Sequence, residues 1–122
     1  MTTDELRRLY VQTRALNQAG ALYGAMLYAD GNFMEYLEGP ELGMKAARRR
    51  ILASRRHVGI LEMVHEPIPH RSYDGFDLGT PHHDSDPVLT AATHRWARQA
   101  ATIDDASATG LQLLRHFWDR VR

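Results

Sequence analysis

The chain contains no cysteine, so disulfide bonds, thiolate metal sites and cysteine nucleophiles are all excluded. It also carries no net charge, because 15 lysine and arginine residues balance 15 aspartate and glutamate residues. Without net charge there is no overall field to draw the chain to nucleic acid or to an anionic membrane surface. We therefore expect neither as a partner.

Long hydrophobic runs are missing as well. The longest apolar stretch, Ala19 to Tyr28, is far shorter than the roughly 20 residues that cross a bilayer. The start, Met1 to Leu6, is polar and acidic, unlike the basic and then apolar start of a secretory signal. We expect a cytoplasmic protein, and a length of 122 residues fits one compact domain.

Catalytic and metal-binding patterns do not stand out. We find no Ser-His-Asp order, no glycine-rich phosphate loop and no paired acids, so we predict no catalytic residue and no enzyme. The tightest histidine cluster, His82-His83-Asp84 with Asp86, has side chains that metals use, but a polar loop without a third ligand is the favoured interpretation. We expect no metal. The run Arg48 to Arg50 is interpreted as a solvated helix face.

The first half of the chain predicts a helix and a hairpin. Apolar residues at three- and four-residue steps predict a helix over residues 4–18, ended by Gly20 in the left-handed conformation. Residues 22–28 and 33–37 read as strands, and the dipeptide Asp30-Gly31 between them is typical of a two-residue turn.

The second half predicts a helix, two strands and two more helices. Gly39-Pro40-Glu41 is typical of a helix start, and residues 58–64 and 76–79 are the strand candidates. Helices are expected around residues 89–96 and 111–121. The apolar stripe of the last helix is most often internal packing, with a dimer or partner surface as the alternative. This order favours an α+β sheet with two helices on one face, provided that one more strand precedes the first helix.

Four sequence blocks carry a resemblance to a known family. They are GAMLY at Gly24–Tyr28, DGNFMEYLEGP at Asp30–Pro40, RRH at Arg55–His57 and EPI at Glu66–Ile68. In order and spacing they resemble the BLUF blocks T-G-x-L-x-Y, D-G-x-F-x-Q-x-L-E-G-P, R-H-x-x-V and E-P-I. No single block is specific, but the four together are, and the resemblance runs from about Asp4 to Gly79.

The resemblance implies a ferredoxin-like fold that holds a flavin, usually FAD, between two helices on one sheet face. It implies a flavin-binding core over residues 1–80 and a C-terminal helical cap over residues 81–122. By spacing, Asn17 matches a flavin-contacting asparagine, although asparagine is also common near helix ends. Arg56 and His57 match a basic pair beside the flavin, and Glu35 stands where the family has glutamine. These four residues are the candidate cofactor-binding residues.

Glu35 departs from the family in a way that matters chemically. A glutamine amide has donor and acceptor faces, whereas an ionised carboxylate only accepts hydrogen bonds, and flavin N5 and O4 are both acceptors. A buried carboxyl with a raised pKa stays protonated and donates one bond. The alternation of Phe33, Glu35 and Leu37 favours an inward side chain at position 35.

The family's first strand, which carries the photochemical tyrosine, has no counterpart here. Only three residues precede Asp4, too few to cross a sheet at about 3.3 Å per residue. We expect a coding start further upstream; a sheet completed by another chain and a rearranged sheet are the alternatives. The stand-ins for the tyrosine are Tyr10, Tyr23, Tyr28 and Tyr36.

The sequence and the resemblance support two candidate functions. The first is a flavin-binding blue-light sensor that signals by changing contacts with a partner protein, favoured by the joint presence of Asn17 and the Arg56-His57 pair. The second is a flavin-free interaction or oligomerisation module with the same fold, favoured by Glu35 and the missing tyrosine. Both features also argue against normal photochemistry in the chain as written.

Overall fold

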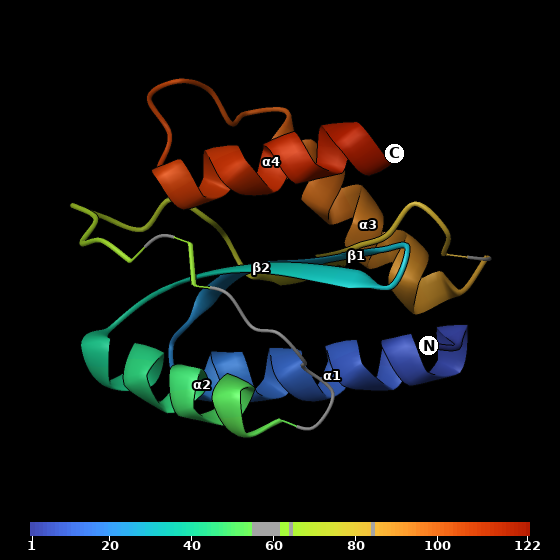
Figure 1. Cartoon of the computed structure of the whole chain (residues 1–122), viewed down its shortest axis with the longest axis horizontal. Coiled ribbons are helices and arrows are strands. Elements are labelled where there is room, and N and C mark those ends of the chain that lie inside the picture. The colour runs from blue at the N-terminus through green and yellow to red at the C-terminus, as the bar shows by residue number, and fades with distance from the viewer. Residues whose placement is uncertain (55–61, 64, 84) are drawn as a thin grey trace.

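The computed structural model describes residues 1–54, 62–63, 65–83 and 85–122. Its elements are α1 (Thr3–Ala19), β1 (Tyr23–Ala29), β2 (Asn32–Glu38), α2 (Glu41–Ala53), β3 (Phe76–Gly79), α3 (Pro87–Ala100) and α4 (Thr109–Val121). The sheet lies between α1 and α2 on one side and α4 on the other (Figure 1). The predicted α+β class, with two helices on one face and two C-terminal helices, is confirmed. The predicted strand over residues 58–64 lies mostly outside the described residues.

The sheet has three strands in the order β2-β1-β3. β1 pairs antiparallel with β2, from Tyr23 opposite Glu38 to Ala29 opposite Asn32, and parallel with β3. The predicted turn joins β1 to β2, with φ of 52° at Asp30 and 80° at Gly31. Two successive positive φ values suit the right-handed twist of a two-residue hairpin, which explains the Asp-Gly sequence.

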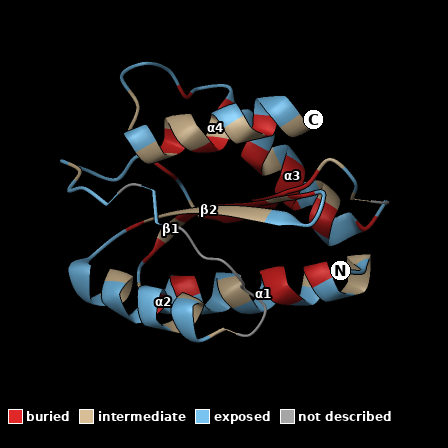
Figure 2. Ribbon diagram, in the orientation of Figure 1, coloured by how far each residue is buried: buried red, intermediate tan, exposed pale blue. Residues whose placement is uncertain are grey.

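β1 divides the core in two because its side chains alternate between the sheet faces. Ala25 and Leu27 belong to a cluster with Trp96 and Trp118 of the C-terminal helices. Met26 belongs to a second cluster that contains residues from α1, β3 and the start of α3. Buried residues accordingly line both sides of the sheet (Figure 2).

The end of α1 corrects one expectation. Gly20 has a φ of −92°, and the left-handed residue is Ala21, with a φ of 55°. The N–H of Leu22 donates to the Asn17 carbonyl at 2.8 Å, and that of Ala21 donates to the Gln18 carbonyl at 3.1 Å. This pair of bonds is the Schellman arrangement, which places the left-handed residue one position later than glycine chemistry alone suggests.

The Glu38 side chain links Ser72 and Tyr73, which precede β3, to the end of β2 by hydrogen bonds. Its side chain is buried and accepts hydrogen bonds from the Ser72 N–H at 2.7 Å, from the Tyr73 N–H, and from the Tyr36 hydroxyl at 2.8 Å. Three donors would be left without their acceptor if this carboxylate were removed.

Among the helices that the structure describes, none combines the length and the apolar character that crossing a bilayer requires.

We expect Glu38→Ala to lower the free energy of unfolding by about 2–4 kcal/mol, because buried donors that lose a charged acceptor cost about 1–3 kcal/mol each and water recovers part of this. Urea denaturation followed by circular dichroism measures the change. Glu41→Ala is the matched control, since the Glu41 side chain is 82% exposed in its ion pair with Lys45. Equal urea midpoints for Glu38→Ala and Glu41→Ala would show that the hydrogen bonds from Ser72 and Tyr73 to Glu38 do not stabilise the fold.

Candidate functional site

Asn17 and Arg50 join α1 to α2 beneath the sheet. The Asn17 side chain is fully buried, and its Oδ1 accepts a hydrogen bond from Arg50 Nη2 at 2.7 Å. Its Nδ2 is also buried, yet it has no hydrogen-bond acceptor among the residues that the structure describes. An unsatisfied buried donor costs about 1–3 kcal/mol. The site is therefore suited to a ligand that offers an acceptor at this point.

Glu35 lies on the sheet face that α1 and α2 cover. It stands opposite Met26, whose side chain belongs to the α1-side cluster, and its neighbours Phe33 and Leu37 pack against that cluster. This agrees with the inward orientation that the alternation predicts. Burial raises the pKa of the Glu35 carboxyl to about 7, and the positive charge of Arg50 opposes that rise.

These groups together form a set of hydrogen-bond donors. Asn17 Nδ2 is a permanent donor, the guanidinium of Arg50 lies beside it, and Glu35 becomes a donor when protonated. A pKa of about 7 means that both protonation states of Glu35 are present near neutral pH. Flavin N5 and O4 are acceptors, so the donor set fits the edge of a flavin ring when Glu35 is neutral.

Arg50 is the member of this set that sequence reasoning missed. The sequence predicts a solvated arginine run at this position. The available signal was its spacing: Arg50 follows Ala47, the buried residue of α2, by three positions, so both lie on one helix face. The other two predicted residues, Arg56 and His57, lie outside the described residues.

Three of the four stand-in tyrosines lie in the sheet and divide between its two faces. Tyr28 lies on the Glu35 face, directly opposite Phe33, and the two ring centroids are 4.6 Å apart. Tyr23 and Tyr36 belong to the opposite face by alternation, and Tyr36 already donates to Glu38. Tyr10 is on α1.

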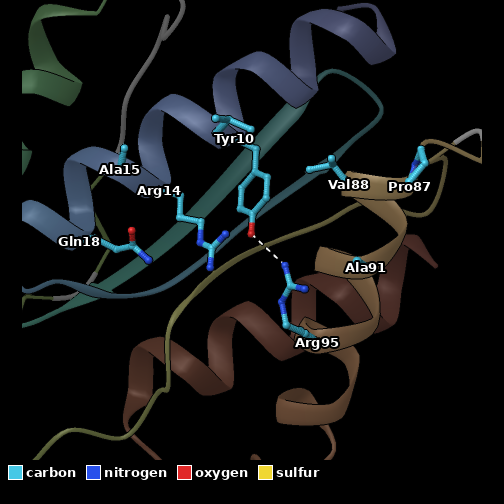
Figure 3. A pocket seen from close by; sticks show the side chains of 9 residues that line it. Tyr10, Arg14, Ala15, Gln18, Pro87, Val88, Ala91 and Arg95 are labelled. Atoms are coloured by element: carbon cyan, nitrogen blue, oxygen red, sulfur yellow. Dashed lines mark hydrogen bonds between the residues drawn. The ribbon is translucent and has the colours of Figure 1, made fainter.

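The hydroxyl of Tyr10 forms hydrogen bonds with residues outside the donor set. It donates to the Phe76 carbonyl at 3.1 Å and accepts from Arg95 Nη2 at 3.3 Å. Figure 3 shows this contact at a groove of about 520 Å³ between α1 and α3, with Arg14 on the α1 wall. Arg95 is also paired with the buried Asp77 at 2.9 Å. The groove includes none of the donor set described above. Tyr28 is a stand-in on the sheet that shares its face with Glu35.

Two members of the predicted histidine cluster, Asp86 and His83, have local partners in the structure. Asp86 caps α3 by accepting from the N–H groups of Val88 and Leu89, each at 3.0 Å. His83 Nδ1 lies 2.8 Å from the Thr90 hydroxyl. Within the described part of the chain, no three histidine, aspartate or glutamate side chains gather as a metal site would require.

Comparison with known proteins identifies the family. Residues 1–79 match the family described as "BLUF: Sensors of blue-light using FAD", and the chain belongs to it. The predicted resemblance is confirmed, and membership supports a role in blue-light sensing with FAD as the family's cofactor.

A solved bacterial light-regulated adenylyl cyclase is similar in structure, with a TM-score of 0.61 and 21% identity over 95% of this chain. At that identity the likeness shows the fold alone. The match covers 32% of the cyclase chain, so this chain spans about a third of its length. No curated protein matches the chain.

The raised pKa of Glu35 makes stability depend on pH. The folded pKa of about 7 lies above the ordinary value of 4.5, so the folded state binds more protons between these limits. The ligand-free chain should therefore lose about 1–3 kcal/mol of unfolding free energy as the pH rises through this window. Urea titrations at several pH values test this.

The neutral variant Glu35→Gln should remove that pH dependence, whereas Glu62→Gln, an exposed control, should retain it. A pH profile unchanged by Glu35→Gln would mean that Glu35 titrates normally.

Proposed function

We propose that this chain binds the isoalloxazine ring of FAD on the sheet face between α1 and α2, as a blue-light sensor. The carrying observation is the buried Nδ2 of Asn17, which finds no acceptor in the described part of the chain, since a flavin carbonyl or ring nitrogen would supply one. The flavin, when bound, absorbs the blue light. Family membership supports this assignment.

Each of the three described residues has a distinct role in this proposal. Arg50 donates to Asn17 Oδ1 and so fixes which end of the amide is turned to the ligand. Asn17 then donates through Nδ2. Glu35 donates when protonated and, by repulsion between its lone pairs and the ring acceptors, weakens binding when ionised. Arg56 and His57 complete the proposed site on the strength of their motif.

For the output, we propose that light shifts the chain between two states that differ in affinity for a partner protein. A ligand or light-induced change acts only through such a difference. The second half of α3 and the helix α4 pack on the sheet face opposite the ring, within the proposed cap over residues 81–122, and are the surface from which a change in β1 and β2 reaches a partner. In this proposal the chain acts in the cytoplasm as a sensor without catalysis.

Binding is tested by titrating the purified chain with FAD and following flavin fluorescence. Asn17→Ala and Arg50→Ala should each weaken binding by about 10- to 100-fold, as expected for loss of about 1.4–2.8 kcal/mol. The control Arg49→Ala removes an exposed arginine one position away on α2 and should leave the affinity unchanged. Equal loss in Arg49→Ala and Arg50→Ala, with no loss in Asn17→Ala, would point to a general charge effect and against this site.

Light-driven electron donation is proposed for Tyr28, which shares the Glu35 face. In flavin-loaded protein, Tyr28→Phe should lengthen the flavin fluorescence lifetime by at least about twofold, because phenylalanine cannot be oxidised in place of the phenol. Tyr36→Phe, on the opposite face, should leave the lifetime unchanged. A lifetime that responds to Tyr36 and not to Tyr28 would contradict this assignment.

The alternative function is a flavin-free interaction module. Glu35 favours it, because the ionised carboxylate disfavours the ring. A correctly folded chain that shows no FAD affinity even at about pH 6, where Glu35 is mostly protonated, would favour this alternative.

A further inference from the structure

The groove between α1 and α3 carries a positive charge that is not balanced locally. Its charged lining residues are Arg14 from α1 and Arg95 from α3, and no acidic side chain is among the described residues that line it. Arg14 is exposed and has no ion pair or hydrogen bond with any described residue. Figure 3 shows its guanidinium directed toward the part of the groove where Arg95 meets Tyr10. The groove therefore favours an anion.

Arg95 is held in one orientation by two buried groups. Its Nε donates to the Asp77 carboxylate at 2.9 Å, and its Nη2 donates to the Tyr10 hydroxyl at 3.3 Å. Asp77 is 3% exposed and Tyr10 is 1% exposed, whereas the Arg95 side chain is 40% exposed. A guanidinium has more N–H donors than these contacts use. Arg95 can therefore donate to a ligand without losing much further side-chain entropy.

The two walls of the groove are also linked to each other. At the start of α3, the Asp86 carboxylate forms an ion pair with Arg7 of α1, and further along α3 Arg95 bonds to Tyr10. The pairing with Arg7 also balances the charge of Asp86, so this acid does not repel an anion nearby. The groove is thus formed before any ligand arrives, and its volume of about 520 Å³ lies within the range of about 300–1,000 Å³ that is usual for small-molecule sites.

Apolar side chains line the groove beside the arginines. They come from both helices: Val11, Ala15, Pro87, Val88 and Ala91. Val11 is 52% exposed and Val88 is 38% exposed, so an apolar group placed between them would remove hydrophobic surface from water. A bare phosphate or sulfate would use the arginines but leave these walls wet. The lining therefore fits an anion that carries an apolar body.

We propose that this groove binds a small organic carboxylate, with the carboxylate at Arg14 and Arg95 and the apolar body along the walls of α1 and α3. Guanidinium and carboxylate groups form short, charge-assisted hydrogen bonds, often in pairs. The proposal goes beyond flavin binding and does not rest on it. The groove lies on the α3 side of α1, whereas the contact of Asn17 with Arg50 is on the α2 side.

Sodium octanoate is a suitable probe, and octanol is its uncharged analogue with the same chain. Nuclear magnetic resonance of the isotope-labelled, flavin-free chain should show saturable shifts at amides of the groove, with a dissociation constant of about 0.1–1 mM for octanoate. Octanol should bind at least about tenfold more weakly, because it lacks the charge. Equal affinities for the two, shifts centred elsewhere, or no saturation up to about 10 mM would overturn the proposal.

Two substitutions at exposed positions of α1 test the site itself. Arg14→Gln should weaken octanoate binding at least about tenfold, and Ala15→Glu, which adds a carboxylate to the groove, should weaken it more. The same spectra show whether each variant is folded. The matched control Arg98→Gln removes an exposed arginine of α3 that does not line the groove, and it should leave the affinity unchanged. An unchanged affinity in Arg14→Gln, or equal losses in Arg14→Gln and Arg98→Gln, would contradict the assignment.

A final titration separates this site from the flavin site. Octanoate should bind the chain in the presence of excess FAD with an affinity within about twofold of that of the flavin-free chain, because the two ligands occupy different sides of α1. Displacement of octanoate by FAD would overturn the separate site. A chain that binds octanoate in the groove but shows no FAD affinity would support this proposal while contradicting the flavin-binding function.

Discussion

The alternation of side chains along β1 is the constraint on which the rest of the structure depends. Ala25 and Leu27 are buried against the C-terminal helices, while Met26 is buried against α1. A one-residue slip would exchange the two sets and lose both cores. Gly24 reinforces the register, since a Cβ there would lie 1.9 Å from the Tyr36 carbonyl oxygen. By fixing β1, the two cores also fix β2, and with it the face on which Glu35 lies.

That placement explains the electrostatics of the site. A carboxyl turned toward a helix-covered sheet face loses hydration, so its pKa rises, and one nearby guanidinium does not fully offset this. The same guanidinium holds the Asn17 amide. In the proposed site, ligand recognition and the ionisation of Glu35 are therefore coupled through Arg50, so we expect flavin affinity to depend on pH.

Much of the fold could be predicted from sequence because its signals are local. The Asp30-Gly31 turn and the period-two alternation around Glu35 specified the hairpin and its inward face. Gly20 was misread because the Schellman bonds, which tie Ala21 and Leu22 back into α1, depend on where the chain must turn into β1. Local preference alone does not contain that information.

The candidate site was predictable only in part. Asn17 and Glu35 were found through motif spacing, and both face the region between α1 and the sheet. Arg50 was not, because three successive arginines carry no mark of which one is turned inward. The crossing of α2 over α1 decides it, and that is a tertiary property. The Arg56-His57 pair stays a prediction.

The absorbance spectrum of the chain, purified from cells supplied with excess flavin and recorded between about 350 and 550 nm before and after blue light, tests the central claim most directly. The account predicts a bound-flavin band that is stronger at about pH 6 than at about pH 8, in step with protonation of Glu35. A folded but colourless protein at both pH values would contradict it.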